Sequence, residues 1–188
     1  MSELENFGRA NDSVVTERPR RMLNITGDTG EFLAVLVVAT QARRVLEIGT
    51  SNGYSTLWLA RAACQIGGSV ITVELSDYKV GLATDNFARS GLAPCINLIQ
   101  DDAAAVLKQL GDGSFDLIFL DSERSEYVKW WPNLKRVLCR RGLLVVDNAT
   151  SHAEEMAPFM ALVNTDESFI TSLVPVGNGE FLAVRPSA

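Results

Sequence analysis

The chain has 188 residues, of which 47% are hydrophobic and 21% are charged, and its formal net charge is −6. This length and composition are typical of one globular domain. The acidic balance argues against a nucleic-acid partner. No apolar run approaches the ~18 residues that a membrane helix needs, so we expect no membrane partner either.

The three cysteines, Cys64, Cys95 and Cys139, are widely spaced and lie in apolar stretches of sequence. None has C-x-x-C or zinc-ligand spacing. We therefore predict free, buried thiols in a reducing compartment. Because residues 1–5 are acidic and polar rather than typical of a signal peptide, we expect a cytoplasmic protein.

The first 21 residues are polar and end in the basic cluster Arg18-Pro19-Arg20-Arg21. We interpret residues 1–21 as a flexible N-terminal segment and residues 22–188 as a single domain. The apolar residues between 32 and 38 then predict a buried helix that ends near Thr40.

Strand-like and helical patterns alternate through the rest of the chain. Such alternation predicts an α/β, Rossmann-like, doubly wound sheet with helices on both faces. Two further strand patterns flank Gly177-Asn178-Gly179, which predicts a hairpin and an antiparallel last strand in a mostly parallel, seven-stranded sheet. The predicted strands are 44–48, 69–74, 96–100, 115–120, 143–146, 169–176 and 180–184, and the predicted helices are 53–66, 77–90, 103–110, 124–138 and 153–163.

The first predicted strand runs into a turn that contains Gly49, Ser51 and Gly53 and is followed by a helical pattern. Glycines allow close backbone approach, and the N–H groups at a helix start suit a nucleotide-like ligand. Ser51 stands where the G-x-G-x-x-G fingerprint has its second glycine, which meets a pyrophosphate. The turn therefore favours a nucleoside ligand without phosphates, and the alternative is a strand–helix turn that binds nothing.

Acidic residues follow or lie near the end of each of the first five predicted strands. Ligands of doubly wound folds bind at these carboxyl ends, so converging acids indicate a site. Glu74 follows the glycine turn by about twenty residues, where a carboxylate accepts hydrogen bonds from a ribose. Asp121, Asp147 and Asn148 offer hard oxygen ligands that suit a divalent cation such as Mg²⁺, although turn chemistry alone also explains them.

The ordered motifs resemble the metal-dependent catechol and caffeoyl-CoA O-methyltransferases. They are Leu46-Glu47-Ile48-Gly49 with Gly53-Tyr54-Ser55, Ile71-Thr72-Val73-Glu74, Asp101-Asp102-Ala103, Phe119-Leu120-Asp121 with Tyr127, and Val146-Asp147-Asn148. The resemblance implies an S-adenosylmethionine site and a Mg²⁺ site. The cofactor residues would be Ile25, Glu47, Gly49, Ser51, Gly53, Ser55, Glu74, Asp102, Ala103 and Asp121, and the metal ligands Asp121, Asp147 and Asn148.

Two positions affect the chemistry that this resemblance implies. Arg124 stands where the family usually has the lysine that takes the hydroxyl proton, and arginine cannot act as a base. We expect Arg124, with Asp121, to act in catalysis by stabilising a phenolate electrostatically. His152 falls where the family often has a substrate-gating residue, so we expect it to face the acceptor, with a surface or helix-cap role as the alternative.

We therefore expect methyl transfer from S-adenosylmethionine to an oxygen of a small aromatic vicinal diol, with Mg²⁺ chelating both oxygens. One alternative keeps the fold but takes another small molecule, or RNA, as acceptor. A second alternative is a homologue that binds the cofactor without catalysis. The presence of Arg124 favours this alternative, whereas the retention of Asp121, Asp147 and Asn148 argues against it. Tyr127, Trp130 and Trp131 predict a core or homodimer surface more than a stacking platform.

Overall fold

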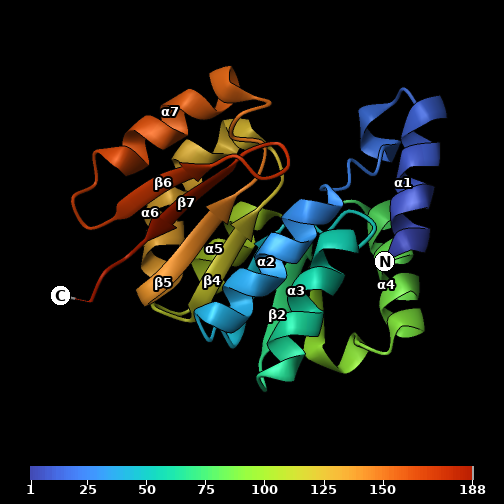
Figure 1. Ribbon diagram of the computed structural model, residues 1–188, viewed down its shortest axis with the longest axis horizontal. Helices are drawn as coiled ribbons and strands as arrows, with labels where there is room; N and C mark the ends of the chain where they lie inside the picture. Colours follow the sequence, from blue (N-terminus) through green and yellow to red (C-terminus); the bar gives the residue numbers. More distant parts are fainter. Residues whose placement is uncertain (188) are drawn as a thin grey trace.

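The computed structural model describes residues 1–187 and has a seven-stranded sheet with helices on both faces (Figure 1). Ala188, the last residue of the predicted domain, lies outside the described residues. The strands are β1 (Arg44–Ile48), β2 (Ser69–Glu74), β3 (Ile96–Gln100), β4 (Phe115–Leu120), β5 (Leu138–Val146), β6 (Ile170–Val174) and β7 (Glu180–Val184). Five of the seven predicted strands have exactly these bounds, which confirms the α/β prediction.

The strand order is β3-β2-β1-β4-β5-β7-β6, and β1 lies between β2 and β4. Parallel pairing joins β3, β2, β1, β4 and β5, whereas β7 runs antiparallel to both β5 and β6. The predicted antiparallel last strand is thus confirmed, and it inserts between β5 and the edge strand β6. The carboxyl ends of β1, β2, β4 and β5 consequently meet along one edge of the sheet.

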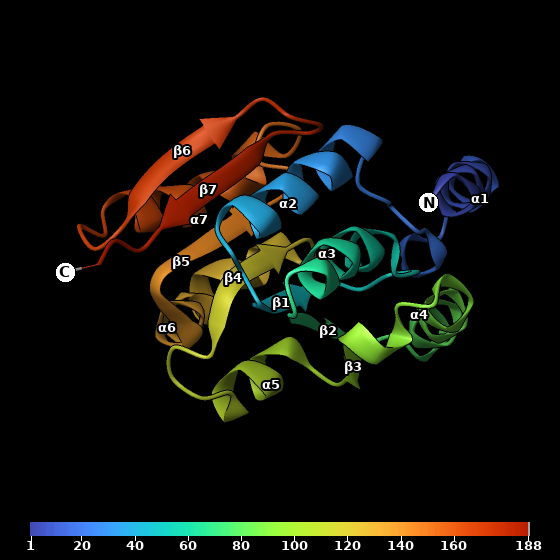
Figure 2. The same cartoon turned by 60° about the horizontal axis from the view of Figure 1, so that its bottom comes forward.

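Seven α-helices and three short 3₁₀ helices are formed by the described residues. They are α1 (Ser2–Val14), η1 (Arg18–Arg20), α2 (Gly27–Ala39), α3 (Tyr54–Gln65), α4 (Asp77–Ser90), η2 (Ala93–Cys95), α5 (Ala103–Gln109), η3 (Arg124–Glu126), α6 (Tyr127–Val137) and α7 (Ala153–Asn164). The helices pack on the sheet in two layers, with α2, α3 and α4 on one face and α5, α6 and α7 on the other (Figure 2).

Alternation along the buried strands divides the core between these two layers. In β1, Val45 packs toward α2 and α3, while Leu46 and Ile48 pack toward the α5–α7 side. This is the two-residue period of a strand buried on both faces. It also places Glu47 on the α3 side, among the side chains beneath the turn that follows β1.

The N-terminal segment differs from the flexible one that we expected, because residues 2–14 form α1. Leu4 is buried, and Glu3 forms an ion pair with Arg89 of α4, beside which α1 lies (Figures 1 and 2). The Asp12 carboxylate also accepts hydrogen bonds from the backbone N–H groups of Met22 and Leu23. Contacts distant in sequence therefore order this polar helix, and its own composition does not reveal them.

The prediction of three free, buried thiols is wrong for two of the cysteines. Cys64 and Cys95 form a disulfide that joins the end of α3 to η2, and Cys64 is exposed. Cys139 is free and half-buried. The expected cytoplasmic location depended partly on free thiols, and the disulfide removes two of the three from that argument. Within residues 1–187, no helix has the length and apolar character needed to cross a membrane.

Candidate functional site

The turn between β1 and α3 packs closely against neighbouring segments at both of its glycines. Gly49 and Gly53 have φ angles of +107° and +86°, which favour glycine. A Cβ on Gly49 would lie 2.0 Å from the backbone oxygen of Asp121, and one on Gly53 would lie 2.4 Å from the Phe87 ring. Both glycines are thus required by packing, and Gly49 joins the predicted cofactor turn directly to the end of β4.

Glu47 supports this turn from beneath. Its fully buried carboxylate accepts hydrogen bonds from the hydroxyls of Ser55 and Thr72, each at 2.6 Å, and from that of Thr56. Burial raises the pKa of Glu47 to about 7, and the hydroxyl donors oppose the rise. The side chains of Glu47 and Ser55, both predicted to contact the cofactor, are therefore engaged with each other inside the protein.

Glu74 lies at the end of β2 and faces the same turn. One carboxylate oxygen accepts from the backbone N–H of Ser51 at 2.9 Å, and the other accepts from those of Leu75 and Ser76 at 3.0 Å. Ser51 has a φ of +50°, and its N–H points toward the strand end. The half-buried carboxylate is thus held in place at the position where we predict the ribose.

The chain segment before α2 lies over these strand ends. The Ser51 hydroxyl donates to the backbone oxygen of Met22 at 2.7 Å. Arg18 pairs with Glu123 at 3.9 Å, and the Arg20 guanidinium lies over the ring of Tyr78. The predicted cofactor residue Ile25, which is buried, therefore follows a segment that contacts the β1 turn, α4 and the loop after β4.

Asp102 and Ala103 lie at the start of α5, one strand further toward the sheet edge. The Asp102 carboxylate accepts from the backbone N–H of Ala105 at 3.0 Å and so caps the helix. The neighbouring Asp101 N–H donates to the backbone oxygen of Glu74 at 3.1 Å, which keeps this turn beside the predicted ribose position. The contact of Asp102 and Ala103 with adenine stays a prediction.

The three predicted metal ligands come together at the ends of β4 and β5. The Asn148 amide nitrogen donates to Asp121 at 3.2 Å and to Asp147 at 2.8 Å. Burial raises the pKa of Asp121 well above its usual range, and the charges of Asp147 and Glu47 raise it further. Burial also raises the pKa of Asp147. Two carboxyl groups are thus held close together in a site where neither is well hydrated.

The donor set fits a divalent cation. Two carboxylates and an amide oxygen are hard ligands, and the buried Oδ1 of Asp147 has no hydrogen-bond partner among the described residues. Nowhere in residues 1–187 are three His, Cys, Asp or Glu side chains grouped so that they alone would hold a metal ion. A cation here would therefore require Asn148, which would turn its amide oxygen toward the two carboxylates.

Glu180 is a further acid at this position that the sequence analysis missed. It is fully buried at the start of β7, and its Oε1 accepts from the Thr29 hydroxyl of α2 at 3.1 Å. Burial and the charge of Asp147 raise its pKa to about 10. Only the strand register reveals this position. Val146 pairs with Phe181 in antiparallel strands, so the next pair is Asp147 and Glu180.

Arg124 supplies positive charge beside the acids. Its side chain is only 9% exposed, and its Nε donates to the Glu155 carboxylate of α7 at 2.8 Å. The guanidinium charge opposes the rise in the pKa of Asp121 and of Asp147. The structure therefore places Arg124 close enough to the predicted cation site to act on charge that develops there.

His152 precedes α7 as its N-cap residue, although its side chain makes no capping hydrogen bond. Its Nδ1 lies 2.9 Å from the Ser151 hydroxyl, and its backbone N–H donates to the oxygen of Asn148. The helix-cap position weighed in the sequence analysis is thus observed. Contact with an acceptor stays a prediction for this partly exposed ring.

The aromatic residues of α6 belong to the core, which was the favoured interpretation. Tyr127, Trp130 and Trp131 are buried against α7, where Tyr127 and Trp131 make edge-on contacts with Phe159. The Tyr127 hydroxyl also accepts a 2.8 Å hydrogen bond from the backbone N–H of Ser122. Tyr127 therefore anchors the loop that carries Asp121.

Comparisons with known proteins give matches over most of the chain. A sequence profile of a family described as O-methyltransferase matches residues 9–186. A catechol O-methyltransferase of Mycobacterium tuberculosis is 39% identical over 139 residues, covering 72% of this chain and 60% of that protein. One from Niastella koreensis is 34% identical, covering 67% of this chain and 58% of that protein. The chain thus spans about three fifths of the length of these two relatives.

Solved structures resemble the whole fold. A cofactor-bound protein from MTB, Rv0187, superimposes with a TM-score of 0.84 and 27% identity, covering 100% of this chain and 91% of that one. A structure described as a putative O-methyltransferase from Klebsiella pneumoniae gives a TM-score of 0.83 at 27% identity, covering 98% of this chain and 88% of that one.

Proposed function

Because this chain belongs to the class I S-adenosylmethionine-dependent O-methyltransferase family, we propose that it methylates an oxygen of a small aromatic vicinal diol with the help of Mg²⁺. The observation that carries the proposal is the meeting of Asp121, Asp147 and Asn148 directly beside the β1 turn. The names of the two catechol O-methyltransferase relatives support the acceptor class.

The cofactor side of the site is formed by the ends of β1 and β2. We propose that Glu74 accepts hydrogen bonds from the ribose hydroxyls, while Ser51 and the glycine turn hold the methionine end. Glu47 does not contact the cofactor in this proposal; it holds the turn in position through its hydrogen bonds with Ser55 and Thr72. Gly49 brings the turn into contact with Asp121, so the methyl group would be presented close to the acidic cluster.

The acceptor side is formed by Asp121, Asp147 and Asn148, which would hold Mg²⁺. When bound, the cation supplies positive charge that favours the ionised form of a chelated hydroxyl. Arg124 adds a fixed positive charge but accepts no proton, so the proton leaves to water. His152 is proposed to border the diol from the start of α7.

We also propose a homodimer formed through the exposed faces of α2 and α3. A surface hollow of about 600 Å³ lies between these helices and includes the apolar residues Val35 and Val38, which are both exposed. Glu31 and Arg61 lie at the same hollow, so a two-fold arrangement that brings Glu31 of one copy to Arg61 of the other would pair opposite charges. Sedimentation of the wild type and of Val35→Glu tests this proposal, because the charge should leave only monomer.

The test of the function is S-adenosylhomocysteine production with a panel of catechols, each compared with the matching monohydroxy phenol. We expect turnover with the diols only, its loss in EDTA and its recovery with Mg²⁺. The phenols are the matched control because one hydroxyl cannot chelate. Full activity in metal-free protein would contradict the cation role. Cofactor binding without turnover on any diol would favour a different acceptor or the non-catalytic alternative.

A further inference from the structure

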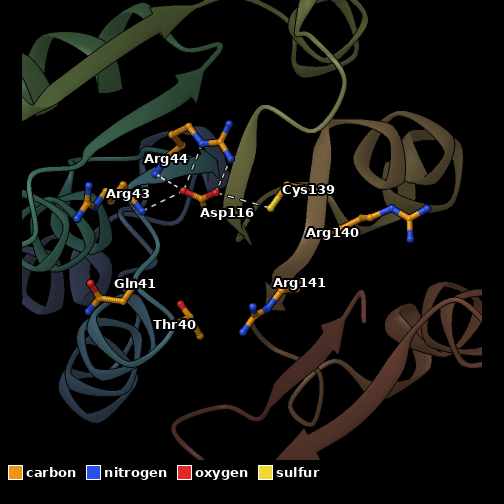
Figure 3. A pocket seen from close by; sticks show the side chains of 8 residues that line it. All are labelled: Thr40, Gln41, Arg43, Arg44, Asp116, Cys139, Arg140 and Arg141. Atoms are coloured by element: carbon orange, nitrogen blue, oxygen red, sulfur yellow. Dashed lines mark hydrogen bonds and ion pairs between the residues drawn. The ribbon is translucent and has the colours of Figure 1, made fainter. Parts of the chain in front are cut away.

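A second hollow lies at the opposite end of the sheet from the proposed active site, where β1, β4 and β5 begin. Its volume is about 390 Å³, which is the size of a small-molecule site. The end of α2 and the first residues of β5 form its walls (Figure 3). It is lined by Thr40, Gln41, Arg43, Arg44, Asp116, Cys139, Arg140 and Arg141.

The charge at this hollow is opposite to that of the chain as a whole. Four arginines and one aspartate line it, although the chain carries a net charge of −6. The Asp116 carboxylate already has an ionic partner and several hydrogen-bond donors. It accepts hydrogen bonds from the Arg44 guanidinium and from the backbone N–H groups of Arg43 and Arg44. Its negative charge is thereby balanced at the floor of the hollow and does not oppose an incoming anion.

The other three arginines have no acidic partner among the residues that the structure describes. No carboxylate in residues 1–187 lies within 4.0 Å of a side-chain nitrogen of Arg43, Arg140 or Arg141. The Arg141 side chain points across the hollow toward Thr40, while Arg43 and Arg140 extend outward on either side (Figure 3). Arg141 therefore faces a ligand in the hollow directly, whereas the exposed side chains of Arg43 and Arg140 would turn inward to bind it.

The backbone holds the two walls in place. Gln41 and Arg141 both have positive φ angles, 55° and 66°, which non-glycine residues rarely adopt. Hydrogen bonds fix both backbone segments, from the Ala42 N–H to the Val37 oxygen and from the Arg141 N–H to the Arg185 oxygen. The arginines thus project from a fixed backbone.

We propose that this hollow binds a small anion carrying two or more phosphate groups. Each guanidinium presents a planar fork of N–H donors that matches two phosphate oxygens. Three guanidinium groups without an acidic partner in residues 1–187 call for a ligand with more than one negative charge. A hollow of this size admits a small molecule rather than a folded partner. The site uses none of the residues assigned to methyl transfer.

Calorimetric titration with inorganic pyrophosphate and tripolyphosphate tests the proposal. We expect the wild type to bind both, and binding to weaken by about tenfold in Arg141→Ala and in Arg43→Ala. Arg9→Ala is the matched control, because it removes the same charge from the exposed face of α1, far from this hollow and from the proposed dimer surface. Thermal unfolding of each variant verifies that the fold is retained.

Two results would overturn the proposal. One is the absence of binding by the wild type at moderate salt, and the other is an equal loss in Arg9→Ala, which would indicate general charge attraction only. S-adenosylhomocysteine binding, measured on the same variants, should not change. Failure of this site and failure of the proposed methyl transfer are therefore distinguishable.

Discussion

The three central strands of the sheet have basic side chains at one end and acidic side chains at the other. β1, β4 and β5 begin beside Arg43, Arg44 and Arg141 and end beside Asp121 and Asp147. At the amino end, Asp116 is neutralised by Arg44, which leaves positive charge in excess. At the carboxyl end the acids outnumber Arg124, and their pKa values are raised.

This difference shows what each end of the sheet can bind. A buried cluster of acids with an unpaired oxygen attracts cations, and S-adenosylmethionine itself carries a positive sulfonium. An exposed cluster of arginines attracts anions instead. The parallel arrangement makes such a division available, because all five parallel strands present the same kind of end at the same edge.

The largest effect is expected when the positive charge at the acidic end is removed. Arg124→Ala should lower the turnover number by about 10–1000-fold, roughly 1.4–4 kcal/mol, because a phenolate loses its fixed partner. Arg124→Lys keeps the charge and should retain or raise activity. Steady-state kinetics with a catechol measures both variants, and unchanged rates in Arg124→Ala would remove this residue from the chemistry.

A change in the buried acid beneath the β1 turn should alter how stability depends on pH. The pKa of Glu47 is about 7 in the folded state, against an ordinary 4.5, so its contribution to stability is present below pH 4.5 and is lost as the pH rises through 7. The difference in unfolding free energy, wild type minus Glu47→Gln, should therefore fall by about 3 kcal/mol as the pH rises from below 4.5 to above 7.

Urea unfolding at several pH values measures this difference. Glu167→Gln is the matched control, because Glu167 is an exposed residue of the loop before β6. A relative stability of Glu47→Gln that does not change with pH would show that Glu47 titrates like a solvated carboxylate.

The strand ends illustrate what the sequence predicted and what it did not. Mostly apolar runs gave the correct bounds of β1, β2 and β4, because strands buried on both faces need such runs. In β5 the exposed Arg140 and Arg141 interrupt the run, so the predicted strand began five residues late. Glu180 was missed for a related reason, since only its pairing across from β5 reveals its position beside Asp147.

Contacts between distant segments account for the remaining differences. The Cys64–Cys95 disulfide joins residues 31 positions apart, and no local pattern indicates that pairing. The helix α1 is polar, and its anchors, Asp12 and Glu3, are ordinary surface residues until their partners are known. The predicted metal ligands could be named because each follows a strand whose end could be read from the sequence.

The cofactor side should respond more moderately. Glu74→Ala should weaken S-adenosylhomocysteine binding by about 2–3 kcal/mol, because hydrogen bonds from ribose hydroxyls to a charged group are lost. Calorimetry measures this change, with Asp85→Ala on the exposed face of α4 as the matched control. Equal affinities in the wild type and Glu74→Ala would refute the ribose assignment.

The smallest effect is expected at the start of α7. His152→Ala should change the Michaelis constant for the catechol by about threefold, the scale of one neutral contact, and should not affect cofactor affinity. Ser151→Ala removes the hydroxyl beside the ring and should have a weaker effect in the same direction. Identical acceptor kinetics in His152→Ala would leave the residue with only its helix-cap position.

The central claim is that the acidic end of the sheet holds a divalent cation, and Mn²⁺ titration followed by electron paramagnetic resonance tests it most directly. The account predicts one Mn²⁺ per chain, displaced by Mg²⁺ and lost in Asp121→Asn and Asp147→Asn. Asp112→Asn, which changes an exposed acid near the opposite end of β4, should bind normally. Absence of binding by the wild type, or binding unchanged in Asp121→Asn and Asp147→Asn, would contradict the account.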